Sequence, residues 1–350
     1  MSWGPSDCSD IRPGPAIQIL SPSRFSSQGP NRGNGRWHLL DRTSTTYLGV
    51  TVGALLGGYY VTHLEKVPET GRRRFMAVSV EQEDYIHKLM VEETLQDFRG
   101  RLLPSNHPLS QQVRRITRRI ITSSNLGHLQ GELAPEPVEM MDPFPAAIPR
   151  PQTLHPDREW VVLVINDRSL VNAFAAPGLV CVSTGIMPVA RNEEGLAAII
   201  GHEIGHVVMR HTSEHLSQAK LFLPIIGLLV MLGLGPFVSA LMMRYFYVLP
   251  HSRALETEAD LMGIKLMARA CYDPGAAPRR GRVFEAFKRL EAVNTFKFLD
   301  THPPTEERIA HLKTLLPASF EIYNSNPECS QLDEMRRRGH LSRVRMNIDC

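Results

Sequence analysis

The feature that most constrains this chain is the sequence HEIGH at residues 202–206. Asn192 is a good helix N-cap and two glutamates follow it, so we expect one helix to run through this segment. Residues four apart project from the same face of an α-helix, so His202 and His206 can meet one metal ion. Glu203 can reach a metal-bound water without being a ligand. In this HExxH pattern the two histidines bind zinc and the glutamate is the general base.

A third protein ligand is needed, because catalytic zinc keeps three of them plus a water. On a continued helix His211 would point about 140° further round than His206 and away from the metal, which argues against it as the third ligand. Glu256 is the better candidate. It shares a helix face with Asp260, whose carboxylate can hydrogen-bond a ligand imidazole. Glu258 should face elsewhere, and we expect it to be solvated.

The composition excludes several classes of protein. With 43% apolar and 21% charged residues, the 350-residue chain can bury a core, and neither global disorder nor a coiled coil is expected. A net charge of +3 gives no argument for a nucleic-acid partner, and we expect none. Five cysteines spread along the chain also exclude a disulfide-stapled mini-domain.

The N-terminal residues 1–43 have the composition of a mitochondrial targeting segment. Residues 11–40 contain arginines and many serines but no acidic residue. Four prolines in the same stretch would interrupt an amphipathic helix, so an untargeted tail remains the alternative. Residues 45–62 carry no charge and are just long enough to cross a bilayer, so we expect a transmembrane anchor over 44–63. A buried core helix is the alternative. Arginines on both sides leave its orientation undetermined.

A second apolar segment, residues 221–243, lies between His206 and Glu256. A single crossing of about 30 Å would place the two halves of the metal site on opposite sides of the membrane. Prolines and glycines in the segment allow a re-entrant hairpin, an interfacial element or two short buried helices. We expect a membrane-associated insert, and a packed helical hairpin in a soluble domain is the alternative.

Other elements can be read from local patterns. Ser79 with Gln82 forms a capping box that opens a helix. A further helix is indicated by Val113, Ile116 and Ile120 opposite a basic face. Residues 160–165 and 179–183 read as strands, with residues 172–174 near a sheet edge. Six prolines make residues 135–151 a loop.

Three motifs in order, GHEIGHVVMRH, SRALETEAD and THPPTEERI, resemble the membrane metallopeptidase family that includes HtpX and the CAAX prenyl protease. The segment NAFAAPGLVCVSTGIM is also similar, and the resemblance covers residues 76–317, leaving 318–350 as a C-terminal extension. It implies an α+β, mainly helical zincin (gluzincin) domain with a small sheet, after an N-terminal transmembrane helix. The Arg-rich GRRRF resembles the mitochondrial branch, which implies the mitochondrial inner membrane.

The resemblance also implies roles for individual residues. It places one zinc ion per chain on His202, His206 and Glu256, with Glu203 as base and Asp260 as the acid behind a ligand histidine. It also implies that His302 would stabilise the transition state, and it includes Arg308 without a specified role. An extended substrate would lie on Asn172, Ala173 and Phe174. One departure is small: the family commonly has two glycines after its proline, whereas Leu179 follows Pro177-Gly178 here.

These inferences predict a zinc-dependent endopeptidase that cleaves inner-membrane proteins for quality control or stress-induced processing, with its active site facing the intermembrane space. The chain lacks the GxxxxGK[ST] signature, so we expect the activity to be ATP-independent. Membrane lipid is a further expected partner, and a homo-oligomer is left open. The alternatives are a non-catalytic membrane scaffold that keeps the zinc site and a soluble peptidase. Cys271 and Cys329 could form a disulfide, but pairing cannot be read from sequence.

Overall fold

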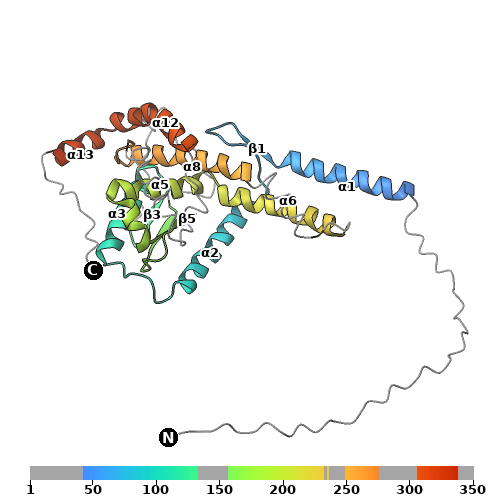
Figure 1. Ribbon diagram of the computed structural model, residues 1–350, viewed down its shortest axis with the longest axis horizontal. Coiled ribbons are helices and arrows are strands. Elements are labelled where there is room, and N and C mark those ends of the chain that lie inside the picture. The colour runs from blue at the N-terminus through green and yellow to red at the C-terminus, as the bar shows by residue number, and fades with distance from the viewer. Residues whose placement is uncertain (1–41, 133–156, 232–234, 236–248, 276–305, 338–350) are drawn as a thin grey trace, which may run out of the picture. The chain divides into compact units, whose positions relative to one another are not determined.

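The computed structural model describes residues 42–132, 157–231, 235, 249–275 and 306–337 (Figure 1). Several predictions lie outside these residues. They concern the targeting segment up to residue 41, the proline-rich loop, most of the second half of the apolar segment 221–243, His302, and the chain after residue 337.

The chain divides into two compact units, residues 1–56 and 57–350. The described part of the first unit is helical and belongs to α1 (Arg42–Thr62). The segment expected as a transmembrane anchor is therefore a helix, but Thr, Gly and Tyr interrupt its aliphatic residues. Within the described ranges, none of the helices combines the length and the apolar character needed to cross a membrane. The predicted transmembrane anchor is thus not confirmed.

The second unit opens with a small hairpin and two helices. β1 (Leu64–Lys66) pairs antiparallel with β2 (Arg73–Phe75). Helix α2 (Val80–Asp97) begins with the predicted capping box between Ser79 and Gln82. Helix α3 (Pro108–Ser123) buries the predicted apolar face, with Val113, Ile116 and Ile120 fully enclosed.

A four-stranded sheet follows in the order β3-β4-β6-β5. Its strands are β3 (His128–Leu129), β4 (Glu159–Ile165), β5 (Ala173–Ala176) and β6 (Leu179–Ser183). β3, β4 and β6 run parallel, whereas β5 is antiparallel to β6 and forms one end of the sheet. The two strands predicted from β-branched runs are thus present, and the segment expected near an edge supplies the edge strand. The short helices η1 (Thr184–Ile186) and α4 (Met187–Ala190) then lead away from β6.

The remaining helices stack on this sheet and on one another. Helix α5 (Glu193–Val208) packs with α3 on the sheet, α8 (Leu249–Arg269) packs on α5, and α12 (Glu306–Ser325) packs on α8 (Figure 1). The described residues also form α6 (His211–Met231) and α13 (Pro327–Arg337). A mainly helical unit with a small sheet agrees with the predicted class. The stack brings residues from three separate helices to one place.

Candidate metal centre

Two histidines and one glutamate converge between α5 and α8. Helix α5 starts at the predicted cap, where the Asn192 side chain accepts a hydrogen bond from the backbone N–H of Gly195. One helical turn separates His202 from His206, and their Nε2 atoms lie 3.1 Å apart. From α8, the Glu256 carboxylate approaches both Nε2 atoms, at 3.4 Å from each. The structure therefore brings together the three residues predicted as metal ligands.

The spacing of these three groups fits a zinc ion. Ligand atoms that surround zinc at about 2.1 Å in a tetrahedral arrangement lie about 3.4 Å from one another. The two Nε2 atoms lie 3.1 Å apart, and each lies 3.4 Å from one Glu256 oxygen, Oε2 for His202 and Oε1 for His206, which is close to this value. Two imidazoles and one carboxylate are also a donor set typical of catalytic zinc. The residues present thus fit the metal that the motif predicts.

Asp260 and Arg308 support the first ligand histidine. Asp260 lies one helical turn beyond Glu256, and its Oδ1 is 3.0 Å from His202 Nδ1. Arg308 from α12 donates to both Asp260 oxygens, at 2.7 and 2.8 Å, and also pairs with Glu256 at 2.9 Å. Such contacts fix the orientation of a ligand imidazole. Sequence reasoning left Arg308 without partners, and the structure shows that they are Asp260 and Glu256.

The charges around His202 favour a cation at this histidine. Burial lowers the pKa of His202, but the carboxylates of Asp260 and Glu256 outweigh it and raise the pKa to about 10. Burial raises the pKa of Asp260, but Arg308 and His202 outweigh that effect, so its pKa is lowered. Asp260 is therefore ionised at neutral pH. A pair of carboxylates that stabilises a proton on His202 also stabilises a metal ion there.

His211 contacts His206, the second histidine predicted as a metal ligand, from the side of the imidazole opposite to Glu256. Helix α5 ends at Val208, and Arg210 takes a left-handed conformation with φ +59° before α6 begins at His211. This break turns the chain, so that His211 Nδ1 lies 2.8 Å from His206 Nδ1. Among the described residues, the group that could hold a metal ion does not include His211, as expected, but the break in the helix gives His211 a contact with His206 that a continued helix would not allow.

Glu258 is buried rather than solvated, which corrects the expectation from the sequence. Its side chain is 3% exposed, and it lies 3.2 Å from His211 Nε2. It also accepts hydrogen bonds from Thr70 and Arg72. Burial raises the pKa of Glu258, but Arg72, His211 and Thr70 outweigh it and hold the pKa well below its usual range. Thr70 and Arg72 lie almost 190 residues away in sequence, so spacing on α8 could not reveal them.

Three glycines let α5 and α8 approach closely enough to form the site. A Cβ at Gly205 would come 2.8 Å from the carbonyl oxygen of Ala259, and one at Gly201 would come 3.2 Å from that of Gly263. A Cβ at Gly263 would come 2.9 Å from the Cα of His202. Any side chain there would separate the helices. Sequence reasoning missed these residues, although two of them stand beside the ligand histidines in the motif.

The other predicted site residues are placed as follows. Glu203 is 4% exposed and follows His202 on α5. Ala173 and Phe174 lie on the end strand β5, and Asn172 immediately precedes it. Strand β5 packs against α5, the helix that carries the two histidines. His302 lies outside the described residues.

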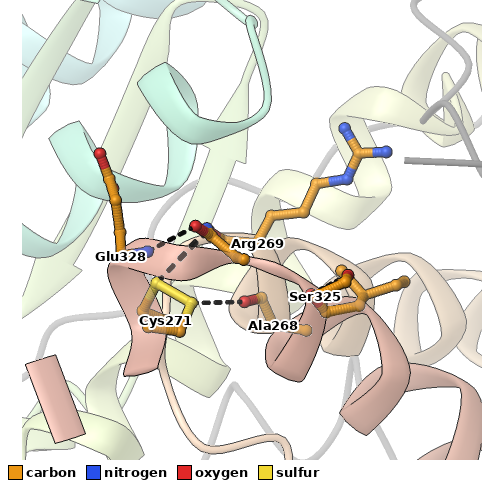
Figure 2. The surroundings of a disulfide bond; sticks show 8 residues. Ala268, Arg269, Cys271, Ser325 and Glu328 are labelled. Atoms are coloured by element: carbon orange, nitrogen blue, oxygen red, sulfur yellow. Dashed lines mark hydrogen bonds between the residues drawn. A yellow bond between two sulfur atoms is a disulfide. The ribbon is translucent and has the colours of Figure 1, made fainter. Parts of the chain in front are cut away.

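Cys271 and Cys329 form a disulfide in the structure (Figure 2). The bridge joins the residues just after α8 to α13, and both cysteines are buried beside Ala268 and Tyr323. The end of the helix that carries Glu256 is thereby tied to the C-terminal helices.

This fold and this site are those expected of a metallopeptidase of the HExxH class, with Glu256 placed where a third ligand is required. Comparison with known proteins agrees: residues 146–316 match the model of peptidase family M48. The mitochondrial metalloendopeptidase OMA1 of Schizosaccharomyces pombe is 33% identical over 79% of this chain and 74% of its own length. The protein of the same name from Saccharomyces cerevisiae is 32% identical over 84% and 80%. The human mitochondrial metalloendopeptidase OMA1 is 27% identical over 87% of this chain and 55% of its own length.

The chain belongs to peptidase family M48. The resemblance inferred from the three ordered motifs is therefore confirmed.

Proposed function

We propose that this protein is a zinc-dependent, ATP-independent endopeptidase of the mitochondrial inner membrane, acting on membrane proteins in quality control or stress-induced processing. The convergence of His202, His206 and Glu256 around one point, with Glu203 beside them, carries the proposal. Membership of a metallopeptidase family and its mitochondrial relatives support it.

The residues have distinct roles in this mechanism. His202, His206 and Glu256 would hold one zinc ion, which when bound would polarise the scissile carbonyl and lower the pKa of a water molecule. Glu203 takes the proton from the attacking water and passes it to the leaving amine. Asp260 and Arg308 hold His202 in the orientation that presents Nε2. His302 remains a proposed stabiliser of the developing oxyanion.

The end strand β5 is suited to hold an extended substrate. A peptide that adds to a sheet edge is held through main-chain hydrogen bonds, whatever its sequence. Residues 172–174 lie at this edge, next to the metal-binding helix. We therefore propose that substrates lie along β5. Because main-chain contacts dominate, the choice of cleavage site would depend mainly on which segments are accessible.

The proposed location rests on the sequence and on the relatives. Residues 1–43 would direct the chain to mitochondria, 44–63 would attach it to the inner membrane, and the insert 221–243 would keep the peptidase domain 76–317 near the lipid. Two relatives of at least 32% identity are mitochondrial by name. The Cys271–Cys329 bridge supports a peptidase domain in the oxidising intermembrane space. A homo-oligomer is left open.

Cleavage of a membrane-anchored reporter by the full-length protein in liposomes tests this proposal. Wild type, Glu203→Gln and Glu194→Gln would be compared at equal zinc content, since Glu194 lies on the same helix but in its first turn. We expect Glu203→Gln to abolish cleavage and Glu194→Gln to retain it. Equal products from wild type and Glu203→Gln would overturn the proposal. Bound zinc without cleavage by any of the three would instead support the scaffold alternative.

A further inference from the structure

The two ligand histidines are supported by different networks. His202 contacts a carboxylate directly, at 3.0 Å from Asp260, and that carboxylate is held by Arg308. His206 instead contacts another histidine, since its Nδ1 lies 2.8 Å from Nδ1 of His211. The carboxylate in this network belongs to Glu258, which lies 3.2 Å from Nε2 of His211. The second network is longer, and none of its outer members belongs to the HExxH motif.

Arg72 ends the second network in the way that Arg308 ends the first. Its Nε and one terminal nitrogen donate to the two oxygens of Glu258, at 2.8 and 2.9 Å. The same guanidinium also holds Glu214 of α6, at 2.7 and 2.8 Å. Thr70 adds a hydrogen bond of 2.6 Å to Glu258. Both Thr70 and Arg72 lie in the loop that joins β1 to β2.

The proton positions along the second network follow from the ligand role of His206. A neutral imidazole has one N–H, so if Nε2 faces the metal, the proton is on Nδ1. Nδ1 of His206 then donates to Nδ1 of His211, whose own proton must be on Nε2. That proton is donated to Glu258, whose carboxylate also accepts hydrogen bonds from Arg72 and Thr70. His211 thus accepts a hydrogen bond from His206 and donates one to Glu258.

We propose that Arg72 is a positioning residue for the metal site: through Glu258 and His211 it fixes the orientation and tautomer of His206. This inference rests on the proposed zinc site and extends it to the β1–β2 hairpin. It makes the hairpin that directly follows α1 part of the machinery that holds the metal. Groups in this position behind a ligand histidine typically change metal affinity by about 10- to 100-fold when they are removed.

A zinc competition experiment tests the inference without relying on activity. Zinc-loaded full-length protein would be titrated with a chelator, for wild type, Arg72→Ala, His211→Ala and the double variant. We expect each single variant to bind zinc about 10- to 100-fold more weakly than wild type. Because Arg72 acts through His211, the double variant should be no weaker than His211→Ala alone.

Arg73→Ala is the matched control, since Arg73 is the next residue in the chain, begins β2 and is exposed to solvent. It should bind zinc as tightly as wild type. Should Arg72→Ala fail to fold, as judged by circular dichroism, Glu258→Gln replaces it, because this change removes the charge while keeping the side-chain size. A merely structural role would lower the melting temperature of these variants but leave the zinc affinity of the folded fraction unchanged.

The outcomes separate this inference from the proposed function. If wild type binds zinc and Arg72→Ala binds it as tightly as Arg73→Ala, the positioning role is refuted and the zinc site stands. An equal loss from Arg72→Ala in the wild-type and His211→Ala backgrounds also refutes it, because Arg72 would then act independently of His211. A wild type that binds no zinc overturns both proposals.

Discussion

Gly263 of α8 lies directly against the backbone of His202 of α5, so that a Cβ at position 263 would come 2.9 Å from the Cα of His202. The position of Glu256 relative to the two ligand histidines depends on this contact, because Glu256 and Gly263 share one helix. The metal site is therefore determined by helix packing as well as by the choice of ligands.

Replacing Gly263 with alanine should damage the site without touching a ligand. The added methyl group forces α5 and α8 apart, and overpacking of this kind costs about 1–3 kcal/mol of unfolding free energy. We expect a loss of this size, together with weaker zinc binding, in denaturant unfolding and chelator competition. The control is Gly58→Ala in α1, where nothing lies within 4 Å. That change should leave zinc affinity unaltered, and equal effects of the two variants would contradict the account.

Removing Arg308 should leave two carboxylates in the interior without their shared cation. Arg308 is 7% exposed and contacts both Asp260 and Glu256. Breaking a buried ion pair by deleting one partner typically costs about 3–5 kcal/mol, and we expect Arg308→Ala to lower the unfolding free energy by that amount. Arg115→Ala is the comparison, since its pair with Glu193 is exposed and contributes at most about 1 kcal/mol. Similar losses for both would show that Arg308 has no special role.

The disulfide should contribute to stability because it closes a long loop. Cys271 and Cys329 are separated by 58 positions, and the chain-entropy model gives about 4 kcal/mol for a loop of that size. We expect the double variant Cys271→Ser, Cys329→Ser to lower the unfolding free energy by up to this amount. Reductant should lower the unfolding free energy of wild type but not that of the double variant. Mass spectrometry of unreduced wild type should find the two cysteine peptides linked. Free thiols at both positions in the natively purified protein would contradict the bridge.

His87 should make stability depend on pH. Burial, with Arg158 and Lys88 nearby, lowers the pKa of His87 to about 4 in the folded chain, against about 6.5 when unfolded. Between these values the unfolded state binds more protons, so stability is full above pH 6.5 and falls as the pH drops towards 4. Because His87 is only partly buried, we expect a loss on the order of 1–2 kcal/mol.

Urea unfolding of wild type and His87→Gln at pH 7, 6 and 5 measures this effect. The difference between the two proteins isolates His87 from other groups that titrate over the same range. The stability of wild type should fall more steeply towards pH 5 than that of His87→Gln. Parallel pH profiles would show that His87 is not responsible.

Local sequence patterns were enough for the parts of the site that lie on single elements. The cap at Asn192, the spacing of His202 and His206, and the face shared by Glu256 and Asp260 depend only on helix geometry, and all appear in the structure. Burial could likewise be predicted from local patterns, namely from the apolar face of α3 and from the β-branched runs of β4 and β6.

The rest depends on contacts between distant segments. Neither Gly nor Pro marks the break at Arg210 that turns His211 towards His206, so an uninterrupted helix was the natural expectation. The sequence of α8 alone predicts a solvated Glu258, because the Arg72 that contacts it belongs to a hairpin far away in sequence. The requirement for Gly263 appears only when α8 packs on α5.

The most direct measurement is the zinc content and the zinc K-edge absorption spectrum of the purified full-length protein. The account predicts one zinc ion per chain, surrounded by two imidazole nitrogens and carboxylate and water oxygens at about 2.0–2.2 Å. It also predicts that Glu256→Ala loses zinc, while Glu203→Gln keeps it. Wild type without zinc, sulfur among its ligands, or a Glu256→Ala variant that retains an unchanged spectrum would contradict the central claim.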